Sequence, residues 1–277
     1  MSVIGDLKDS RGLLVNLTLR EVRGKYKRTA LGQGWSLLNP IATLLIYTAV
    51  FGFVLRVPVP VGERSGIQIF ALYLACALLP WTFFSNSVTS GMGALIANAN
   101  LLRKVFFWRP TLVLANVFSW VVTFGIELMV LIVALLIVGS MPLPWLPFLV
   151  LAIALLMLFA LGIALLLSVA NVYFRDTQHF VSIAMQLWFY ATPIVYPYSL
   201  IQDQAERMRA AGNDFPLEFI YRLNPMERFV TVFRSMLYDN TFPAWDDVVF
   251  CIVAAGLSLL IGFTVFARSQ HRLVEEL

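Results

Sequence analysis

Five cations that lie close together near the N-terminus are the residues best suited to binding a negatively charged group. They are Arg20, Arg23, Lys25, Lys27 and Arg28. Residues 13–28 have the spacing of an amphipathic helix, and its polar side carries most of these cations. Its apolar side consists of Val15, Leu19, Val22 and Tyr26. We expect this helix to lie in the cytoplasmic headgroup layer, with its cations facing anionic lipid; the alternative is a solvated surface helix.

A single acid, Glu127, lies in the middle of a long apolar run. An ionised carboxylate at that depth of a membrane costs about 3 kcal/mol or more, so it must be protonated, paired or in contact with water. Two interpretations are open. Glu127 either takes part in transport or makes a structural hydrogen bond to a neighbour such as Gln186, and no second acid or base in another apolar run indicates a proton relay.

The motifs of nucleotide hydrolysis and metal chemistry are missing from the sequence. It has no GxxxxGK[ST] loop, no glycine-rich dinucleotide turn and no HExxH motif. Neither His179 nor His271 has cysteine or carboxylate neighbours at the spacing of metal ligands. We therefore predict no metal or cofactor on this chain and no ATP hydrolysis by the chain alone. If it moves a substrate uphill, the energy must come from a partner, because intramembrane charge for an ion gradient is scarce.

The composition is that of an integral membrane protein. Of 277 residues, 60% are hydrophobic and only 13% are charged, whereas roughly 25% charged residues are usual in soluble domains. Both cysteines, Cys76 and Cys251, fall in apolar runs and are predicted to be small buried hydrophobic residues. Residues 1–34 have no continuous apolar run, so we expect no cleaved signal peptide and a cytoplasmic N-terminus.

Six apolar segments are long enough to cross a bilayer, which needs about 20 residues for each helix. They are residues 35–57, 67–94, 111–138, 145–172, 177–196 and 248–267. The short outer loops hold only Arg56 and Arg64, so the distribution of basic residues places both termini in the cytoplasm. Pro80 and Pro193 lie within predicted spans and are expected to kink them.

A short cytoplasmic segment separates the second and third spans. Its residues combine apolar and basic side chains in the manner of a helix parallel to the membrane: Leu101, Leu102, Arg103, Lys104, Val105 and Phe106. The functional interpretation is a docking site for a cytoplasmic partner, and the alternative is a plain turn packed on lipid.

The outer segment between the fifth and sixth spans, residues 197–245, is too long for an ordinary loop. Its second half has helical spacing of apolar residues but is too short and too charged to span a membrane. We predict a re-entrant or interfacial pair of short helices broken at Asn224 and Pro225, covered by protein or by a water-filled cavity.

Three stretches of the sequence, residues 17–40, 171–197 and 221–239, together resemble the transmembrane subunit of the ABC-2 type polysaccharide exporters. The resemblance implies an all-α, type V ABC exporter-like fold. It divides the chain into a cytoplasmic interface segment (residues 1–34), a six-helix membrane domain (residues 35–267) and a cytoplasmic tail (residues 268–277). It also implies a homodimer that binds two copies of a separate subunit carrying ATP and Mg²⁺.

The resemblance also implies roles for the segments described above. The five cations would form the entrance for a glycan linked to a polyprenyl diphosphate; the other interpretation is that they only set orientation and bind anionic lipid. The coupling helix over residues 98–107 would begin at Asn98, and the outer segment over residues 198–243 would form a gate with Tyr221, Asn224, Pro225, Phe229 and Phe233. The channel would be lined by aromatic residues of the first and fifth spans: Tyr47, Phe51, Phe53, Trp188, Phe189 and Tyr190. For each aromatic residue alone, a position in the interfacial belt is the alternative.

The sequence therefore predicts the permease subunit of an ATP-driven exporter of lipid-linked polysaccharide in the bacterial plasma (inner) membrane. One alternative is an ABC-2 permease for a drug or a small lipid. An alternative of another class is a membrane glycosyltransferase or scaffold. The glycosyltransferase would need paired acids at a cytoplasmic face, where Asp176 stands alone beside Arg175.

Overall fold

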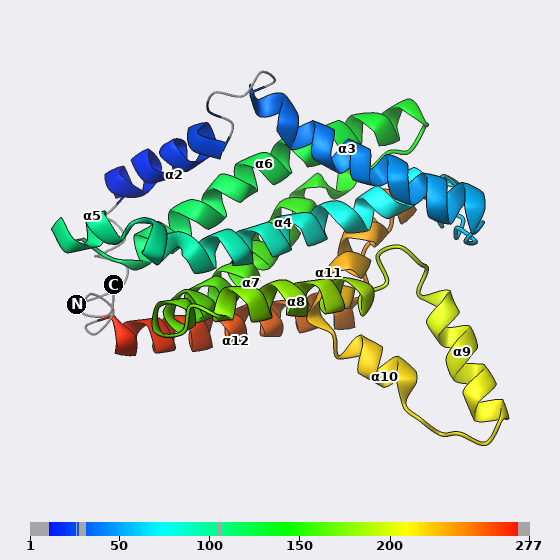
Figure 1. Cartoon of the computed structure of the whole chain (residues 1–277). Coiled ribbons are helices and arrows are strands. Elements are labelled where there is room, and N and C mark those ends of the chain that lie inside the picture. The colour runs from blue at the N-terminus through cyan, green and yellow to red at the C-terminus, as the bar shows by residue number, and fades with distance from the viewer. Residues whose placement is uncertain (1–10, 26, 28–31, 105–106, 271–277) are drawn as a thin grey trace.

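Long helices run side by side through the part of the chain that this computed structural model describes, namely residues 11–25, 27, 32–104 and 107–270 (Figure 1). Within those ranges every regular element is helical and there is no strand. Five stretches are long and apolar enough to cross a membrane: Leu37–Val54, Phe70–Ala97, Pro110–Ile137, Leu143–Tyr173 and Trp245–Ser269. The all-helical membrane class that the composition predicted is therefore confirmed.

The helices follow one another with short connections through most of the chain. The first half contains α2 (Arg11–Lys25), η1 (Gly32–Gly34), α3 (Trp35–Tyr47), its π-helical continuation η2 (Thr48–Val54), α4 (Phe70–Ala97), α5 (Ala99–Lys104) and α6 (Pro110–Ile137). The second half contains η3 (Leu143–Trp145), α7 (Leu146–Tyr173), α8 (Thr177–Tyr190), α9 (Ser199–Ala210), α10 (Leu217–Arg222), α11 (Pro225–Arg234), the π-helix η4 (Ser235–Asp239) and α12 (Trp245–Ser269).

The segment predicted as the fifth span, residues 177–196, differs from the other five. Its helix α8 has 14 residues and ends at Tyr190, so it is not among the five long candidates. The chain bends over residues 191–196, which contain Pro193. Proline lacks an amide hydrogen and disfavours helical backbone at the residue before it, which explains why the helix stops early. By contrast, Pro80 lies inside α4, which continues past it.

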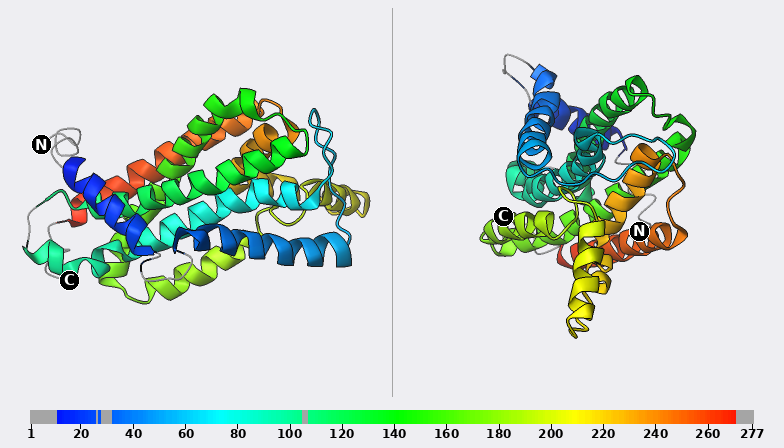
Figure 2. Two further views of the ribbon diagram at one scale, coloured as in Figure 1. Left: turned by 90° about the horizontal axis from the view of Figure 1, so that it is seen from above. Right: turned by 90° about the vertical axis from the view of Figure 1, so that its right-hand side faces the viewer.

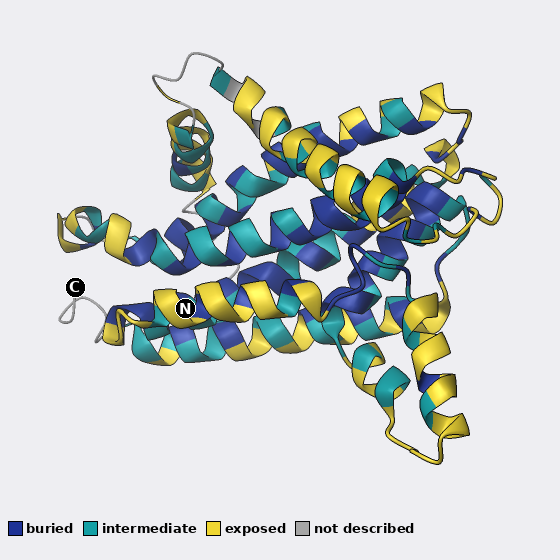
Figure 3. Cartoon of the chain, turned by 45° about the vertical axis from the view of Figure 1, so that its right-hand side comes forward, coloured by how far each residue is buried: buried dark blue, intermediate teal, exposed yellow. Residues whose placement is uncertain are grey.

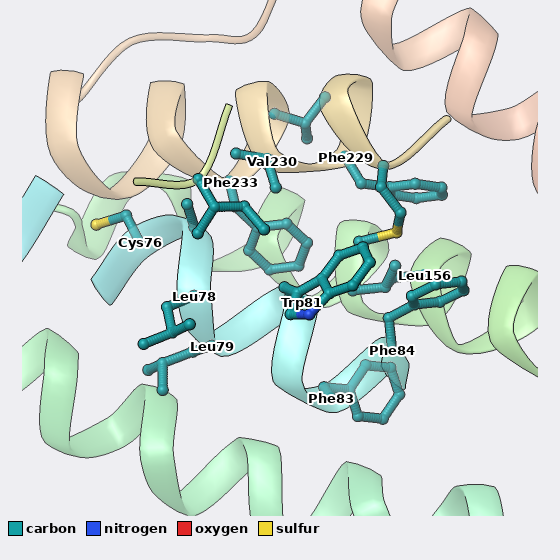
Figure 4. Packing of buried hydrophobic residues seen from close by; sticks show 14 of the residues in the cluster. Cys76, Leu78, Leu79, Trp81, Phe83, Phe84, Leu156, Phe229, Val230 and Phe233 are labelled. Carbon is teal, nitrogen blue, oxygen red and sulfur yellow. The ribbon is translucent and has the colours of Figure 1, made fainter. Parts of the chain in front are cut away.

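Helix α4 is the centre of the bundle and packs against α6, α7, α8 and α11. Most of it is buried, whereas nothing in Leu37–Val54 is buried within the single chain (Figure 3). Aromatic residues fill much of the core around it, including Trp81, Phe83 and Phe84 with Phe233 of α11 (Figure 4). Cys76 and Cys251 are both buried free thiols, as the sequence predicted.

Helices α7 and α12 cross at unusually short range because both carry glycine there. A Cβ atom on Gly262 would collide with the carbonyl of Gly162, and one on Gly162 would collide with Ser258. Ser258 Oγ also donates a hydrogen bond of 2.8 Å to the carbonyl oxygen of Phe159. Close crossings at small residues are a common way to hold helices together in lipid, where packing replaces the hydrophobic effect.

The two ends of the bundle differ in character. Helices α2 and α5 lie at one end, beside the C-terminal end of α12, and α9 and α10 lie at the other end (Figures 1 and 2). The basic interface segment and the segment predicted to dock a partner are therefore close to each other. The structure places the outer segment far from both.

Candidate functional site

Helix α2 is attached to the bundle by apolar residues other than those on its predicted apolar side. Leu17 is buried in a cluster with Leu95, Leu102 and Phe266. Val15 and Leu19 are exposed in the single chain, at 49% and 44% of their full surface. The helix thus has two apolar sides, one held by protein and one open to its surroundings. Tyr26 lies outside the described residues.

Arg20 connects α2 to the end of α4. Its Nη2 atom donates hydrogen bonds of 2.7 Å to Glu21 Oε1 and of 2.7 Å to Asn98 Oδ1, and its Nε donates to Glu21 Oε1 at 3.3 Å. An open cavity of about 520 Å³ with both polar and apolar lining lies beside this contact, between α2, α4 and α6. Its lining consists of Arg20, Glu21, Thr89, Ser90, Gly93, Ala94, Ala97, Asn98 and Asn116. The structure thus brings a predicted entrance cation into contact with a residue of the predicted coupling segment.

Lys25 points into the bundle. Its Nζ atom lies 3.4 Å from the centroid of the Trp120 ring and donates a 3.4 Å hydrogen bond to Thr123 Oγ1. Burial lowers the pKa of Lys25 to about 7, and the charges of Glu21 and Glu127 oppose this change. Lys25 is therefore half-buried, whereas Arg23 and Lys27 are exposed. The structure does not describe Arg28.

Glu127 is buried on α6, four residues after Thr123 on the same side of the helix. Among the described residues it makes no hydrogen bond to Gln186, which is exposed on α8. The base whose charge acts on Glu127 is Lys25. The sequence missed this neighbour because Lys25 belongs to α2, outside the predicted spans.

Helix α5 is short and has two distinct sides. Leu102 is buried and Leu101 is half-buried against the same apolar cluster that holds Leu17. Arg103 and Lys104 are exposed. Val105 and Phe106, which the sequence assigns to the apolar side, lie outside the described residues. The described part of the segment therefore presents cations outward from an apolar anchor.

The predicted channel residues form part of an aromatic cluster. Tyr47 lies 5.9 Å from Phe51 and 6.0 Å from Phe189, measured between ring centroids. Trp81 connects Trp188 to this group. The centroid of its ring lies 6.2 Å from that of Trp188 and 5.7 Å from that of Phe189. The sequence analysis missed Trp81, because its position in the middle of a long apolar run does not distinguish core from channel.

Phe53 and Tyr190 differ from the other predicted channel residues. Phe53 is 77% exposed and Tyr190 is 54% exposed in the single chain. Tyr190 still packs edge-on against Phe189, with 5.2 Å between the centroids. Phe53 lies on the continuation of α3 and Tyr190 lies on α8, the two segments predicted to line the channel.

The outer segment contains one helix more than the predicted pair. Helix α9 lies in the first half of the segment, for which the sequence predicted no element, and α10 and α11 are separated at Asn224. Asn224 Oδ1 accepts hydrogen bonds from Trp188 Nε1 at 2.7 Å and from the Met226 amide at 3.0 Å. Its Nδ2 donates to the Ala191 carbonyl and to Thr192 Oγ1. Asn224 therefore caps α11 and fastens it to the end of α8.

The other predicted gate residues divide between surface and core. Phe229 and Phe233 are fully buried against Phe159 and Phe124, respectively. Tyr221 is half-buried, and its hydroxyl lies 3.5 Å from that of Tyr196. Pro225 is the first residue of α11, where its missing amide hydrogen costs nothing. The two phenylalanines thus anchor the segment within the bundle.

Buried charges also fasten this segment. Arg234 donates to the carbonyl oxygens of Pro193 and Ile194, at 2.6 and 2.7 Å, and its guanidinium lies over the Tyr73 ring. Arg228 forms an ion pair with Asp247 at the start of α12. These contacts were not predicted, because no local pattern in the sequence pairs residues so far apart.

Burial raises the pKa of Glu227 to about 7. Arg228 and a hydrogen bond from Thr231 oppose this change, whereas the like charge of Asp247 adds to it. Glu227 Oε2 has no hydrogen-bond partner in the described part of the chain. No group of three or more histidine, cysteine or acidic residues within the described ranges could hold a metal ion.

The long apolar helices and the charged ends of the bundle define a multi-pass membrane protein. The family model of the ABC-2 type transporter matches residues 13–238. The chain therefore belongs to the ABC-2 type transporter family, whose members are transport components rather than enzymes in their own right.

Two relatives match nearly the whole chain, and a third matches about two thirds of it. The O-antigen export system permease protein RfbA of Myxococcus xanthus is 30% identical over 276 residues, which cover 99% of each chain. An RfbA of Klebsiella pneumoniae is 28% identical over 95% of this chain and 94% of its own. The polysialic acid transport protein KpsM of Escherichia coli is 25% identical over 68% of this chain and 71% of its own.

Proposed function

We propose that this chain is the permease subunit of an ABC exporter that carries a lipid-linked polysaccharide from the cytoplasmic side to the outer side of the plasma membrane. The observation that carries the proposal is the match to a permease of O-antigen export along 99% of both chains. The KpsM relative transports another polysaccharide, polysialic acid, which favours glycan over a drug or a small lipid as the cargo.

The working unit is proposed to be a homodimer of six-helix subunits with two ATP-binding subunits. Helix α8 and the bend after it would form the fifth of the six spans, in addition to the five long helices. The exposed apolar side of Leu37–Val54 and the exposed residues Ile183, Leu187 and Tyr190 of α8 support a lateral contact with a second copy. The aromatic cluster around Tyr47 and Phe189 would then lie beside the passage, where flat rings offer sugar chains contact surfaces with little sequence preference.

The end of the bundle that holds α2 and α5 is proposed to be cytoplasmic. Its exposed cations Arg23, Lys27, Arg103 and Lys104 agree with the usual excess of basic residues on that side. Arg23 and Lys27 would meet the diphosphate of the substrate at the membrane surface, since both arginine and lysine bind phosphate well. Arg103 and Lys104 would meet the ATP-binding subunit.

Reconstitution tests the proposed function. The purified permease and its ATP-binding subunit are placed together in liposomes that contain a polyprenyl-diphosphate glycan on the outer leaflet, and ATP is added outside. Complexes with their ATP-binding side outward should carry the glycan into the lumen, where an added glycosidase no longer reaches it. Transport of a small lipid with no protection of the glycan would favour the alternative cargo.

The docking assignment has its own test. Reversing the charges with Arg103→Glu and Lys104→Glu should lower the co-purified ATP-binding subunit at least tenfold, because both side chains are exposed on α5. The matched control is Arg207→Glu with Arg209→Glu on α9 at the opposite end, which should leave assembly unchanged. Unaltered assembly of the α5 variant would remove the docking role.

A further inference from the structure

The contact between Arg20 and Asn98 joins helix α2 to the start of helix α5, the predicted docking helix. Asn98 is the residue between α4 and α5. Its backbone carbonyl accepts from the amides of Leu101 and Leu102, at 2.9 and 3.1 Å. Its Nδ2 donates at 2.9 Å to the Ala94 carbonyl in the last turn of α4. The backbone carbonyl of Asn98 thus stabilises the first turn of α5, and its side-chain oxygen accepts the hydrogen bond from Arg20.

The geometry of the Arg20 guanidinium shows which of its N–H groups each partner uses. Glu21 Oε1 accepts from Nε and Nη2 together, which occupies one edge of the planar group. Asn98 takes the other hydrogen of Nη2, which belongs to the edge formed by Nη1 and Nη2. No partner of Nη1 is present among the residues that the structure describes. A bidentate ligand on that edge must therefore displace Asn98, while Glu21 remains in place.

The cavity beside Arg20 has the size and chemistry for such a ligand. Its volume of about 520 Å³ lies in the usual range of ligand pockets. The hydroxyl groups of Thr89 and Ser90 donate to carbonyls of their own helix, and Asn116 Nδ2 donates to the Leu112 carbonyl. Arg20 is the cation of this lining and Glu21, its ion-pair partner, is the acid, and the Arg20 side chain is half exposed. A phosphate is the anion that binds most naturally to two parallel N–H groups of arginine.

We propose that Arg20 is a switch that exchanges Asn98 for a phosphate group of the substrate, so that filling the cavity frees the first turn of the docking helix. A charged acceptor forms stronger hydrogen bonds than a neutral amide oxygen, which drives the exchange. Leu17 of α2 and Leu102 of α5 are buried in the same apolar cluster, which keeps both helices attached to the bundle during the exchange. The proposal rests on the proposed function in two respects, since it takes the substrate to carry a phosphate and α5 to be the docking site of the ATP-binding subunit.

Hydrogen exchange of the full-length permease in lipid nanodiscs tests the switch without any partner subunit. The readout is the exchange rate of the Leu101 and Leu102 amides, and the probe is inorganic pyrophosphate. Saturating pyrophosphate should raise the rate at least threefold in the wild type. Arg20→Gln should show the raised rate without pyrophosphate and no response to it. The control Arg11→Gln removes an exposed cation of the same helix to which no binding role is assigned, and it should behave as the wild type.

Two results of this experiment would overturn the proposal. One is a wild-type exchange rate that pyrophosphate leaves unchanged at saturation, and the other is an Arg20→Gln variant that exchanges as slowly as the wild type. Arg20→Lys adds a second check. A lysine attracts phosphate but lacks the planar guanidinium group with its two donor edges. The variant should therefore bind pyrophosphate without the coupled release of Asn98.

A double-mutant cycle in the assembled complex tests the consequence for ATP hydrolysis, with farnesyl diphosphate as the probe. Arg20→Gln and Asn98→Ala should each reduce stimulation at least fivefold, and the double variant should lose no more than either single one. Asn116→Ala is the matched control. Asn116 and Asn98 both line the cavity and both donate to the carbonyl four residues earlier, but only Asn98 touches Arg20.

The outcomes of the cycle separate the switch from the proposed function. Full stimulation of ATP hydrolysis in Asn98→Ala, with none in Arg20→Gln, would mean that Arg20 only binds the phosphate. That result would overturn the switch. A wild-type complex that does not assemble or is not stimulated, combined with the expected hydrogen exchange, would overturn the proposed function and leave the switch intact.

Discussion

Asn224 is the residue whose replacement should most directly loosen the outer segment from the membrane helices. In Asn224→Ala the Met226 amide loses its cap, which costs about 1 kcal/mol, and the Trp188 indole N–H loses its acceptor, which costs about 1–3 kcal/mol. The two losses together should lower the free energy of unfolding by about 2–4 kcal/mol. For a chain of this size that corresponds to a fall of roughly 5–15 °C in the midpoint of thermal unfolding.

Thermal unfolding of the purified permease in detergent measures this effect, with two variants for comparison. Asn224→Asp keeps both acceptor bonds and loses only the Nδ2 bonds to Ala191 and Thr192, so its midpoint should lie between those of the wild type and Asn224→Ala. Asn213→Ala removes a cap of similar chemistry from an exposed loop, where Asn213 accepts from the Phe215 amide, and should cost less than about 0.5 kcal/mol.

Two outcomes would refute this account of Asn224. An Asn224→Ala variant that unfolds at the wild-type temperature would mean that the hydrogen bonds contribute no net stability. An equal loss in Asn213→Ala would mean that capping alone, and not the connection to α8, explains the effect.

Two further perturbations follow from the packing and the buried charges. Gly262→Ala should destabilise the protein by about 2 kcal/mol or more in the same assay, because its methyl group would separate α12 from α7 at Gly162; Gly256→Ala, which faces open space on the same helix, should not. Glu227→Gln should flatten the pH dependence of unfolding. The pKa of Glu227 is about 7 in the folded chain and 4.5 in its unperturbed state, so the folded state binds the extra proton and loses stability as pH rises from about 5 to 8.

Each of these two perturbations is judged against a matched protein, Gly256→Ala for the first and the wild type for the second. Equal effects of alanine at Gly262 and Gly256 would show that helix propensity, rather than the crossing, determines the result. The pH test compares the difference in unfolding midpoint between pH 5.5 and pH 8.5, which should be smaller in Glu227→Gln than in the wild type. An identical difference in both proteins would mean that Glu227 is already ionised at pH 5.5.

The long helices could be predicted from the sequence because the requirement that produces them is local. In lipid a backbone must satisfy its own hydrogen bonds, so a run of about 20 apolar residues can hardly be anything but a helix. The predicted spans at 67–94, 111–138 and 145–172 lie within a few residues of α4, α6 and α7. The break at Asn224 and Pro225 was also predictable, since its cap and its proline act within the same turn.

The candidate site was predictable only in its residue types. The cations near the N-terminus could be identified as a group, yet Arg20 contacts Asn98, Lys25 enters the bundle beside Trp120, and Arg23 and Lys27 stay exposed. The helical pattern of α2 could not separate these roles, because apolar residues occur on two of its sides.

The sequence by itself determined that this chain is an all-helical membrane protein, which residues are apolar enough to cross the bilayer and where its cations gather, because hydrophobicity and backbone hydrogen bonding depend on neighbouring residues. Only the tertiary structure decided which side of each helix is buried, that Arg20 meets Asn98 and that Asn224 fastens α11 to α8. Those contacts join segments far apart in the chain, and their partners are selected by the packing of the whole bundle around α4.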